Sequence, residues 1–221
     1  FYEKEFQPHV ERWDDQGCVD RDAWLKAGEA GILCASIKEE YGGGGGNFGH
    51  EMVIAEEQGR AGISGFGNSV HSGIVAHYIQ SYGTEEQKKK WLPKMATGEI
   101  VGAIAMTEPG TGSDLQGVKT TAKKSGNQYV VNGQKTFITN GQHADLVILA
   151  VKTDPKAGAR GTTLFLVDSQ LDGFSRGRNL DKIGQHAGDT SELYFSDVRT
   201  PASSVLGRVG GGFGHLMDEL P

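Results

Sequence analysis

The sequence predicts an α+β multidomain fold, in which an N-terminal all-α helical domain precedes a β-barrel or β-sandwich middle domain and the C-terminal helical domain is missing. Apolar residues recur with a period of about 3.6 up to residue 98, as on a helix face, and with a period of about 2 after it, as in half-buried strands. A further helix-like period begins at Phe213 and Leu216. We therefore expect a helical domain at 1–98, a β domain at 99–209 and the start of a truncated helical domain at 210–221.

Helix signals mark the first domain. Asp20 is a candidate N-cap, and Gly31 is a candidate stop for the helix that follows it. Thr84, with Gln87 three residues later, has the spacing of a capping box. The basic run 88–90 in this last helix is expected to be a solvated face, because blocks this short rarely bind anything alone. Helices are expected over residues 1–13, 20–31, 47–59, 70–82 and from 84 onward.

Strand signals mark the second domain. The dipeptide Asn132-Gly133 lies between two apolar runs and predicts a two-residue hairpin turn there. Short strands separated by turn residues are typical of a small barrel or sandwich rather than of a parallel doubly wound sheet. Strands are expected over residues 101–106, 118–123, 128–131, 135–139, 146–151, 162–167 and 192–195.

Composition and charge exclude several classes of function. The chain has 22 Lys and Arg against 28 Asp and Glu, a net charge of −6, which is the wrong sign for a nucleic-acid-binding surface. Its apolar runs fall far short of the roughly 20 residues of a membrane span. Cys18 and Cys34 are too few for a disulfide framework and suit a reducing compartment. Glycine is abundant, with 34 of 221 residues, as expected where backbone approaches a cofactor closely.

Three familiar motifs fail on context. Residues 44–49 match G-x-G-x-x-G, but an acidic, helix-like stretch precedes them instead of a strand, so we interpret them as a surface glycine loop. Residues 133–136 resemble a phosphate loop only in part, since the glycine is not adjacent to the lysine and the setting is a predicted hairpin. The seven histidines lack metal-ligand spacing, and no G-x-S-x-G nucleophile motif is present.

One segment, residues 105–114, has the composition of a ligand-binding loop. A buried-looking strand runs into Pro109, which fixes φ and offers no N–H group. Such a loop brings backbone N–H groups and hydroxyls against a planar or phosphorylated ligand, but a polar strand-to-loop turn has the same composition, and from the residues alone both interpretations stay open. Glycines and hydroxyl residues fill it at Thr107, Gly110, Thr111, Gly112 and Ser113.

Together with other segments, this loop resembles the acyl-CoA dehydrogenase family. The matching segments follow one another in order and span nearly the whole chain. Within the family, the long-chain type is the most similar, through residues 70–75 and 218–221. The segments that carry the resemblance are 41–43, 82–87, 104–117, 129–141, 182–184, 192–195, 198–201 and 212–213.

The resemblance implies an FAD site between the β domain and the helices. Carried over by position, Thr107 hydrogen-bonds the flavin pyrimidine edge, Thr139 places its hydroxyl at flavin N5, and Phe137, where many members carry Trp, stacks on the flavin. Ser113 reaches the pyrophosphate or the CoA of the substrate. The cofactor-binding residues that the resemblance implies are Ile104, Ala105, Met106, Thr107, Glu108, Pro109, Gly110, Thr111, Gly112, Ser113, Phe137, Ile138 and Thr139.

The implied reaction is the α,β-dehydrogenation of an acyl-CoA thioester to the trans-2-enoyl-CoA, a step of fatty acid β-oxidation, with electrons passed to an electron-transfer flavoprotein. The resemblance places the catalytic glutamate in the C-terminal domain, beyond Pro221, and matches Glu219 to a structural position instead. It also implies a homo-oligomer, a tetramer, in the bacterial cytoplasm or the mitochondrial matrix. Without the third domain, residues 1–221 alone are expected to bind flavin weakly or not at all and not to turn over.

Two alternatives remain open at this point. An acyl-CoA oxidase-like flavoenzyme shares the flavin motif but lets oxygen reoxidise the flavin. A non-catalytic flavin- or acyl-CoA-binding protein keeps the fold and lacks the base.

Overall fold

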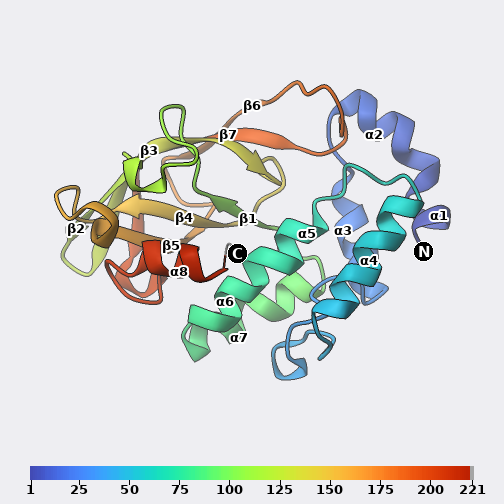
Figure 1. Ribbon diagram of the computed structural model, residues 1–221, viewed down its shortest axis with the longest axis horizontal. Coiled ribbons are helices and arrows are strands. Elements are labelled where there is room, and N and C mark those ends of the chain that lie inside the picture. The colour runs from blue at the N-terminus through green and yellow to red at the C-terminus, as the bar shows by residue number, and fades with distance from the viewer. Residues whose placement is uncertain (220–221) are drawn as a thin grey trace.

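The computed structural model describes residues 1–219; Leu220 and Pro221, which belong to the expected C-terminal period, lie outside the described residues. The helices of residues 1–96 gather at one side of the molecule and the strands at the other, and the last helix, Gly212–Glu219, lies on the strand side, as Figure 1 shows. The predicted change from a helical to a β domain is confirmed: the helix α7 ends at Ala96 and the strand β1 begins at Gly102.

The helices of the first domain lie close to where the apolar periods place them. The stretch 1–13 is broken into two short helices by a 3-10 turn at Gln7–His9, because Pro8 interrupts helical hydrogen bonding. The stretch 70–82 begins earlier, at Asn68, and contains a π-helical turn at His71–Val75. The helices are α1 (Tyr2–Glu5), α2 (Val10–Gln16), α3 (Arg21–Glu29), α4 (Phe48–Arg60), α5 (Asn68–Val70), α6 (Ala76–Tyr82) and α7 (Glu85–Ala96).

The predicted helix caps differ in their outcome. Thr84 and Gln87 form the predicted capping box at the start of α7. Asp20 does stand at the N-cap of α3, but its carboxylate bonds no helix N–H group and pairs with Arg12 instead. The surface glycine loop predicted at 44–49 is confirmed for residues 44–47, whereas Phe48 and Gly49 lie in the first turn of α4.

The β domain is one strongly bent sheet of eight strands. Its strand order is β6-β7-β3-β2-β4-β5-β8, and β1 pairs with β4 in parallel. Two strands, β6 and β8, were not predicted, because β6 is polar and glycine-containing and β8 has only two residues. The strands are β1 (Gly102–Ala105), β2 (Thr121–Ser125), β3 (Gln128–Thr139), β4 (Leu146–Lys152), β5 (Thr162–Asp168), β6 (Phe174–Asn179), β7 (Thr190–Pro201) and β8 (Val205–Leu206), and the helix α8 (Gly212–Glu219) follows.

The predicted hairpin turn at Asn132-Gly133 is wrong. These residues lie inside β3, which runs without a break from Gln128 to Thr139. The two-residue turn is Gly126-Asn127, which connects β2 to β3 and places Ser125 opposite Gln128. Both dipeptides have turn composition, and strand pairing on both sides of β3 decides between them.

The strand β4 joins the two domains, because both of its faces are buried. Leu146, Ile148 and Ala150 pack in one apolar cluster with residues of α6 and α7. Val147 and Leu149 face the opposite way, into a second cluster inside the bent sheet. A third cluster lies among the N-terminal helices. The strand β4 therefore packs against helices on one face and against the rest of the sheet on the other.

Candidate functional site

The structure brings together the two segments that the resemblance assigns to the cofactor. The segment 106–113 continues from the end of β1, and Phe137–Thr139 ends β3. The two segments meet where the backbone N–H group of Thr136 donates to the carbonyl of Thr107 at 2.9 Å. Residues that lie about thirty positions apart in the sequence are thus joined directly.

A buried ion pair holds the same junction. The Nζ atom of Lys135 lies 2.9 Å from Glu108 Oε1 and 2.9 Å from the carbonyl oxygen of Met106. The Glu108 carboxylate also accepts the backbone N–H groups of Lys119 at 2.7 Å and Thr120 at 2.9 Å. The side chains of the pair are 0% and 6% exposed. The carboxylate of Glu108 therefore serves the scaffold, and only its backbone is left for a ligand.

Both members of this pair are charged at neutral pH. Burial raises the pKa of Glu108, but the Lys135 ammonium and the N–H donors outweigh burial and hold that pKa below its ordinary value. Burial lowers the pKa of Lys135 to about 8, against the Glu108 carboxylate, which raises it. A value of about 8 still leaves the lysine protonated at pH 7.

A bulge in β3 turns Phe137 out of the sheet. Lys135 pairs with Leu193 and Ile138 pairs with Ser191, so two residues of β3 face one residue of β7. Phe137 has a φ of 59°, in the left-handed region that bulky residues rarely adopt. Its ring is 66% exposed, between two buried neighbours on the strand.

The predicted cofactor residues divide into those that offer a side chain and those that do not. Ala105 and Ile138 are buried in the β-domain core, so they offer at most their backbone. The hydroxyl of Thr111 already donates to the carbonyl of Gly117 at 2.9 Å. Within the described residues, three predicted hydroxyls have no hydrogen-bond partner: those of Thr107, Ser113 and Thr139.

Residues 108–111, between Thr107 and Ser113, form a tight turn. The N–H group of Glu108 donates to the carbonyl of Thr111 at 2.9 Å, and the N–H group of Thr111 donates back at 3.0 Å. Pro109 and Gly110 form the exposed tip. An added Cβ at Gly110 or Gly112 would meet nothing within 4 Å, so these glycines leave open space above the loop.

These observations fit a flavin. An isoalloxazine ring is planar, apolar on its faces and rich in hydrogen-bond acceptors and donors along its edge. The exposed ring of Phe137 offers it a stacking surface, and the unpartnered hydroxyls of Thr107 and Thr139 lie on the two adjoining segments. Lys135 is the residue that sequence reasoning missed here. Its neighbours Gln134 and Thr136 are polar, so the sequence gives no signal that its ammonium is buried against Glu108.

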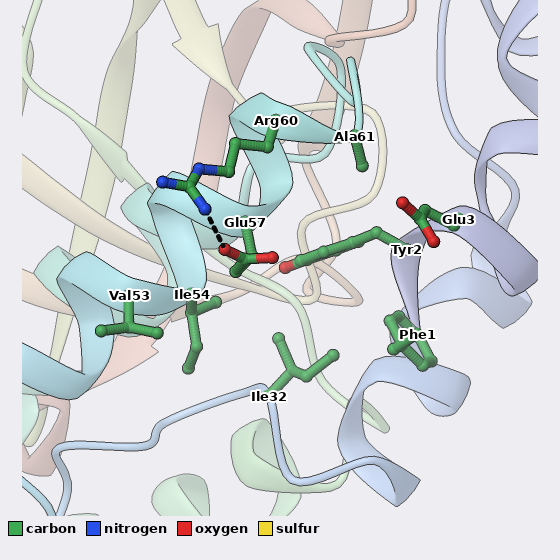
Figure 2. A pocket seen from close by; sticks show the side chains of 9 residues that line it. All are labelled: Phe1, Tyr2, Glu3, Ile32, Val53, Ile54, Glu57, Arg60 and Ala61. Carbon is green, nitrogen blue, oxygen red and sulfur yellow. Dashed lines mark hydrogen bonds and ion pairs between the residues drawn. The ribbon is translucent and has the colours of Figure 1, made fainter.

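A separate cavity of about 510 Å³ lies in the helical domain, between α1 and α4. Figure 2 shows Tyr2 reaching from α1 towards Glu57 on α4, where Arg60 pairs with Glu57 at 3.3 Å. Its lining residues are Phe1, Tyr2, Glu3, Ile32, Val53, Ile54, Glu57, Arg60 and Ala61, none of which belongs to the predicted cofactor residues.

Residues 1–219 contain neither a membrane-spanning helix nor a cluster of metal-ligating side chains. None of the helices found there is long and apolar enough to cross a membrane. Among the same residues, His, Cys, Asp and Glu side chains form no group of three that could hold a metal ion.

Comparisons with known proteins identify the family and the fold. The long-chain specific acyl-CoA dehydrogenase of Mus musculus, a mitochondrial protein, is 49% identical over 223 residues, which cover 100% of this chain and 52% of that protein. A crystal structure of an acyl-CoA dehydrogenase from Geobacillus kaustophilus superposes with a TM-score of 0.97 at 53% identity and covers 100% of this chain and 58% of its own. An acyl-CoA dehydrogenase from Bacillus anthracis, solved in complex with FAD, gives a TM-score of 0.89 at 36% identity, over 99% of this chain and 37% of its own.

The chain thus spans about half the length of the curated relative. The N-terminal domain of acyl-CoA dehydrogenases matches residues 1–99, and their middle domain matches residues 103–198. The chain belongs to the acyl-CoA dehydrogenase family and carries its N-terminal and middle domains.

Proposed function

We propose that this chain forms the flavin-binding part of an FAD-dependent acyl-CoA dehydrogenase. One observation carries the proposal: β3 presents an exposed aromatic residue, Phe137, in a strained conformation, beside a loop in which the hydroxyls of Thr107 and Ser113 bond no other group of the described residues. Backbone strain of this kind persists only where the surrounding structure holds it, and it gathers at functional sites. The FAD-bound relative from Bacillus anthracis supports the choice of cofactor.

In this proposal each residue has a separate task. Phe137 stacks against the ring system, and the hydroxyls of Thr107 and Thr139 bond its edge. Ser113, exposed at the end of the loop, reaches the pyrophosphate or the CoA of the substrate. Ile104, Ala105, Met106, Glu108, Pro109, Gly110, Thr111, Gly112 and Ile138 shape the contact surface through their backbone and packing.

The reaction needs a proton and a hydride to leave neighbouring carbons of an acyl thioester. FAD, when bound, accepts the β-hydrogen as hydride. This chain's residues hold the ring against the helices and exclude water from one of its faces. We assign the base that takes the α-proton to the protein beyond Pro221 and not to Glu219, which ends α8.

The finer properties follow the same relatives. The 49% identity to the mouse enzyme supports a long-chain acyl-CoA as substrate. We propose an electron-transfer flavoprotein as the electron acceptor, a homotetramer as the assembly, and the mitochondrial matrix or the bacterial cytoplasm as the compartment.

The test is an absorbance spectrum of the full-length protein, recorded before and after anaerobic addition of a long-chain acyl-CoA. A flavin band that bleaches is the expected result, and repetition with shorter chains identifies the preferred substrate. A band that persists with every chain length would favour a binding protein without the base. A full-length protein that takes up no FAD would contradict the proposal at its root.

An acyl-CoA oxidase-like enzyme differs from a dehydrogenase in its electron acceptor, which is oxygen. A dehydrogenase consumes little oxygen with acyl-CoA until an electron acceptor is added, whereas an oxidase-like enzyme consumes oxygen directly. Oxygen uptake, measured with and without an artificial acceptor, decides between the two.

A further inference from the structure

The buried pair Lys135–Glu108 has a position that folding alone does not explain. Lys135 is the last residue of β3 in regular register before the bulge that carries Phe137. Glu108 follows Thr107 directly. Each charge therefore lies one or two residues from a residue proposed to touch the flavin.

The pair supplies most of the polar contact between the two flavin segments. Among the described residues, three polar contacts join 106–108 to β3. One is the backbone hydrogen bond from Thr136 to Thr107, and the other two come from the Lys135 ammonium. The strand β1 itself pairs with β4, so β1 pairing does not fix the loop against β3.

Stability is a weak reason to bury this pair. Removing two charges from water has a large desolvation penalty, and apolar replacements of similar volume are often neutral or stabilising. An ammonium, however, fixes the direction and length of its bonds, here 2.9 Å to each acceptor, as an apolar contact does not. The Lys135 ammonium can therefore hold the segment 106–108 at a fixed distance from β3.

We propose that Lys135 is a positioning residue for the flavin: through Met106 and Glu108 it sets the gap between the loop that carries Thr107 and the strand that carries Phe137 and Thr139. This inference rests on the proposed function. In this role Lys135 contacts neither the flavin nor the substrate. It acts only by fixing the distance between Thr107 and the pair Phe137 and Thr139.

The experiment compares variants of the full-length protein. Lys135→Met removes the ammonium at similar length, and the double variant Lys135→Met/Glu108→Gln removes both charges, so that no carboxylate is left unpaired. Lys152→Met is the control, because Lys152 is also a lysine with little exposed surface, on β4, and it bonds the carbonyl of Gly158 at 2.6 Å, outside both flavin segments.

The measurements are FAD affinity, by quenching of flavin fluorescence on titration with apoprotein, the absorption bands of the bound flavin, and thermal unfolding of the apoprotein. We expect Lys135→Met and the double variant to weaken FAD binding at least about tenfold, equal to about 1.4 kcal/mol, and to shift the flavin bands. The double variant should regain most of the stability that the single variant loses. Lys152→Met should lose stability and keep wild-type affinity and bands.

The outcomes separate this inference from the proposed function. A wild-type protein that binds FAD, with a folded double variant whose affinity and bands equal the wild type, would overturn the inference alone. So would a Lys152→Met control that weakens FAD binding as much as Lys135→Met does. A wild-type protein that binds no FAD would overturn the proposed function as well.

Discussion

Phe137 is the residue at which backbone conformation and the proposed function are most clearly connected. A φ of 59° is unfavourable for a bulky side chain, and the ring that this conformation exposes loses the contacts that a core position would give it. Its neighbour Ile138 is 2% exposed and makes those contacts instead. The strand thus devotes one residue to the core and the adjacent residue to the surface, within the same bulge.

This contrast predicts opposite results for two adjacent substitutions. Phe137→Gly relieves the left-handed strain and removes an exposed ring, so the free energy of unfolding should stay within about 1 kcal/mol of the wild type while FAD affinity falls. Ile138→Ala opens a cavity and should lower the free energy of unfolding by about 2–5 kcal/mol. Urea unfolding and FAD titration check both. Equal destabilisation by the two substitutions, or intact FAD affinity in Phe137→Gly, would contradict this account.

His71 gives a pH dependence with a definite sign. It is fully buried; its Nδ1 atom accepts the N–H group of Gly102 at 3.0 Å, and its Nε2 atom lies 3.1 Å from the Met95 carbonyl. Burial lowers its pKa to about 4, from 6.5 in the unfolded chain, so the unfolded state binds a proton first on acidification. The stabilising effect of neutral His71 is complete above pH 6.5 and is lost as the pH falls towards 4.

Urea unfolding at pH 7.5 and at pH 4.5 measures this loss. The shift of the His71 pKa allows a decrease of up to about 3 kcal/mol. His143, whose burial lowers its pKa to about 4, adds to this decrease, and Asp189, whose burial raises its pKa to about 6, opposes it. His71→Gln should be less stable at pH 7.5 and should lose less on acidification. If the variant and the wild type lose the same amount, His71 is not the group responsible.

At the scale of elements, composition predicts where the chain turns less well than it predicts helices. Asn132 was expected in a turn, but its side-chain amide donates to Asp197 Oδ1 at 2.9 Å and its Oδ1 accepts the Asp197 N–H group at 2.9 Å. Those bonds hold a bulge of β7, where Ser196 and Asp197 face Asn132. The turn-forming chemistry of asparagine is present, but β7, distant in the sequence, decides how it is used.

The junction of α5 with the sheet is also set by one side chain. Asn140, which follows Thr139, donates to the carbonyls of Gly67 at 3.0 Å and Gly102 at 3.2 Å. A Cβ at Gly67 would lie 1.9 Å from Asn140 Oδ1, so no side chain fits there while Asn140 keeps this position.

We therefore expect Gly67→Ala to lower the free energy of unfolding by about 2 kcal/mol or more, and Asn140→Gly to lower it through two lost hydrogen bonds. Asn140→Gly removes the obstacle, and glycine adopts the φ of 65° found there without strain. The double variant should be clearly more stable than the sum of the single effects predicts. Strict additivity in denaturant unfolding would show that the two residues are not coupled.

The capping box of α7 also connects this helix to Ser203 and Val205, so its two residues should contribute differently to stability. Gln87 accepts the N–H group of Thr84, and its amide also donates to the carbonyls of Ser203 at 2.7 Å and Val205 at 3.0 Å. Thr84→Ala should cost about 1 kcal/mol, as for other caps. Gln87→Ala should cost more, since it also removes the bonds that join α7 to the turn at Ala202–Ser204 and to the start of β8. Thermal unfolding ranks the two, and a larger effect of Thr84→Ala would contradict the order.

At the scale of the whole molecule, the sequence carries the architecture better than the site. The change of period near residue 98 predicts both domains, because it depends only on which side chains are buried. The predicted site segments do meet. The ion pair between Lys135 and Glu108 that joins them could not be predicted, because the two residues are 27 positions apart and each is of a type usually found at the surface. A buried ion pair is recognisable only once the fold has removed water from both partners.

The strand β4 belongs to the apolar cores of both domains, which predicts that the two domains unfold cooperatively. Ile148 packs with Ile79 and Leu92 of the helices, while Leu149 faces the interior of the sheet, so the apolar clusters of the two domains join through one strand. We expect the domains to unfold as a unit. In native-state hydrogen exchange on the full-length protein, Ile148→Ala should lower the opening free energies of α6 and β4 amides by equal amounts, about 2–4 kcal/mol, and the exposed Lys123→Ala should change neither. Loss of protection in β4 with unchanged protection in α6 would show that the helices fold independently of the sheet.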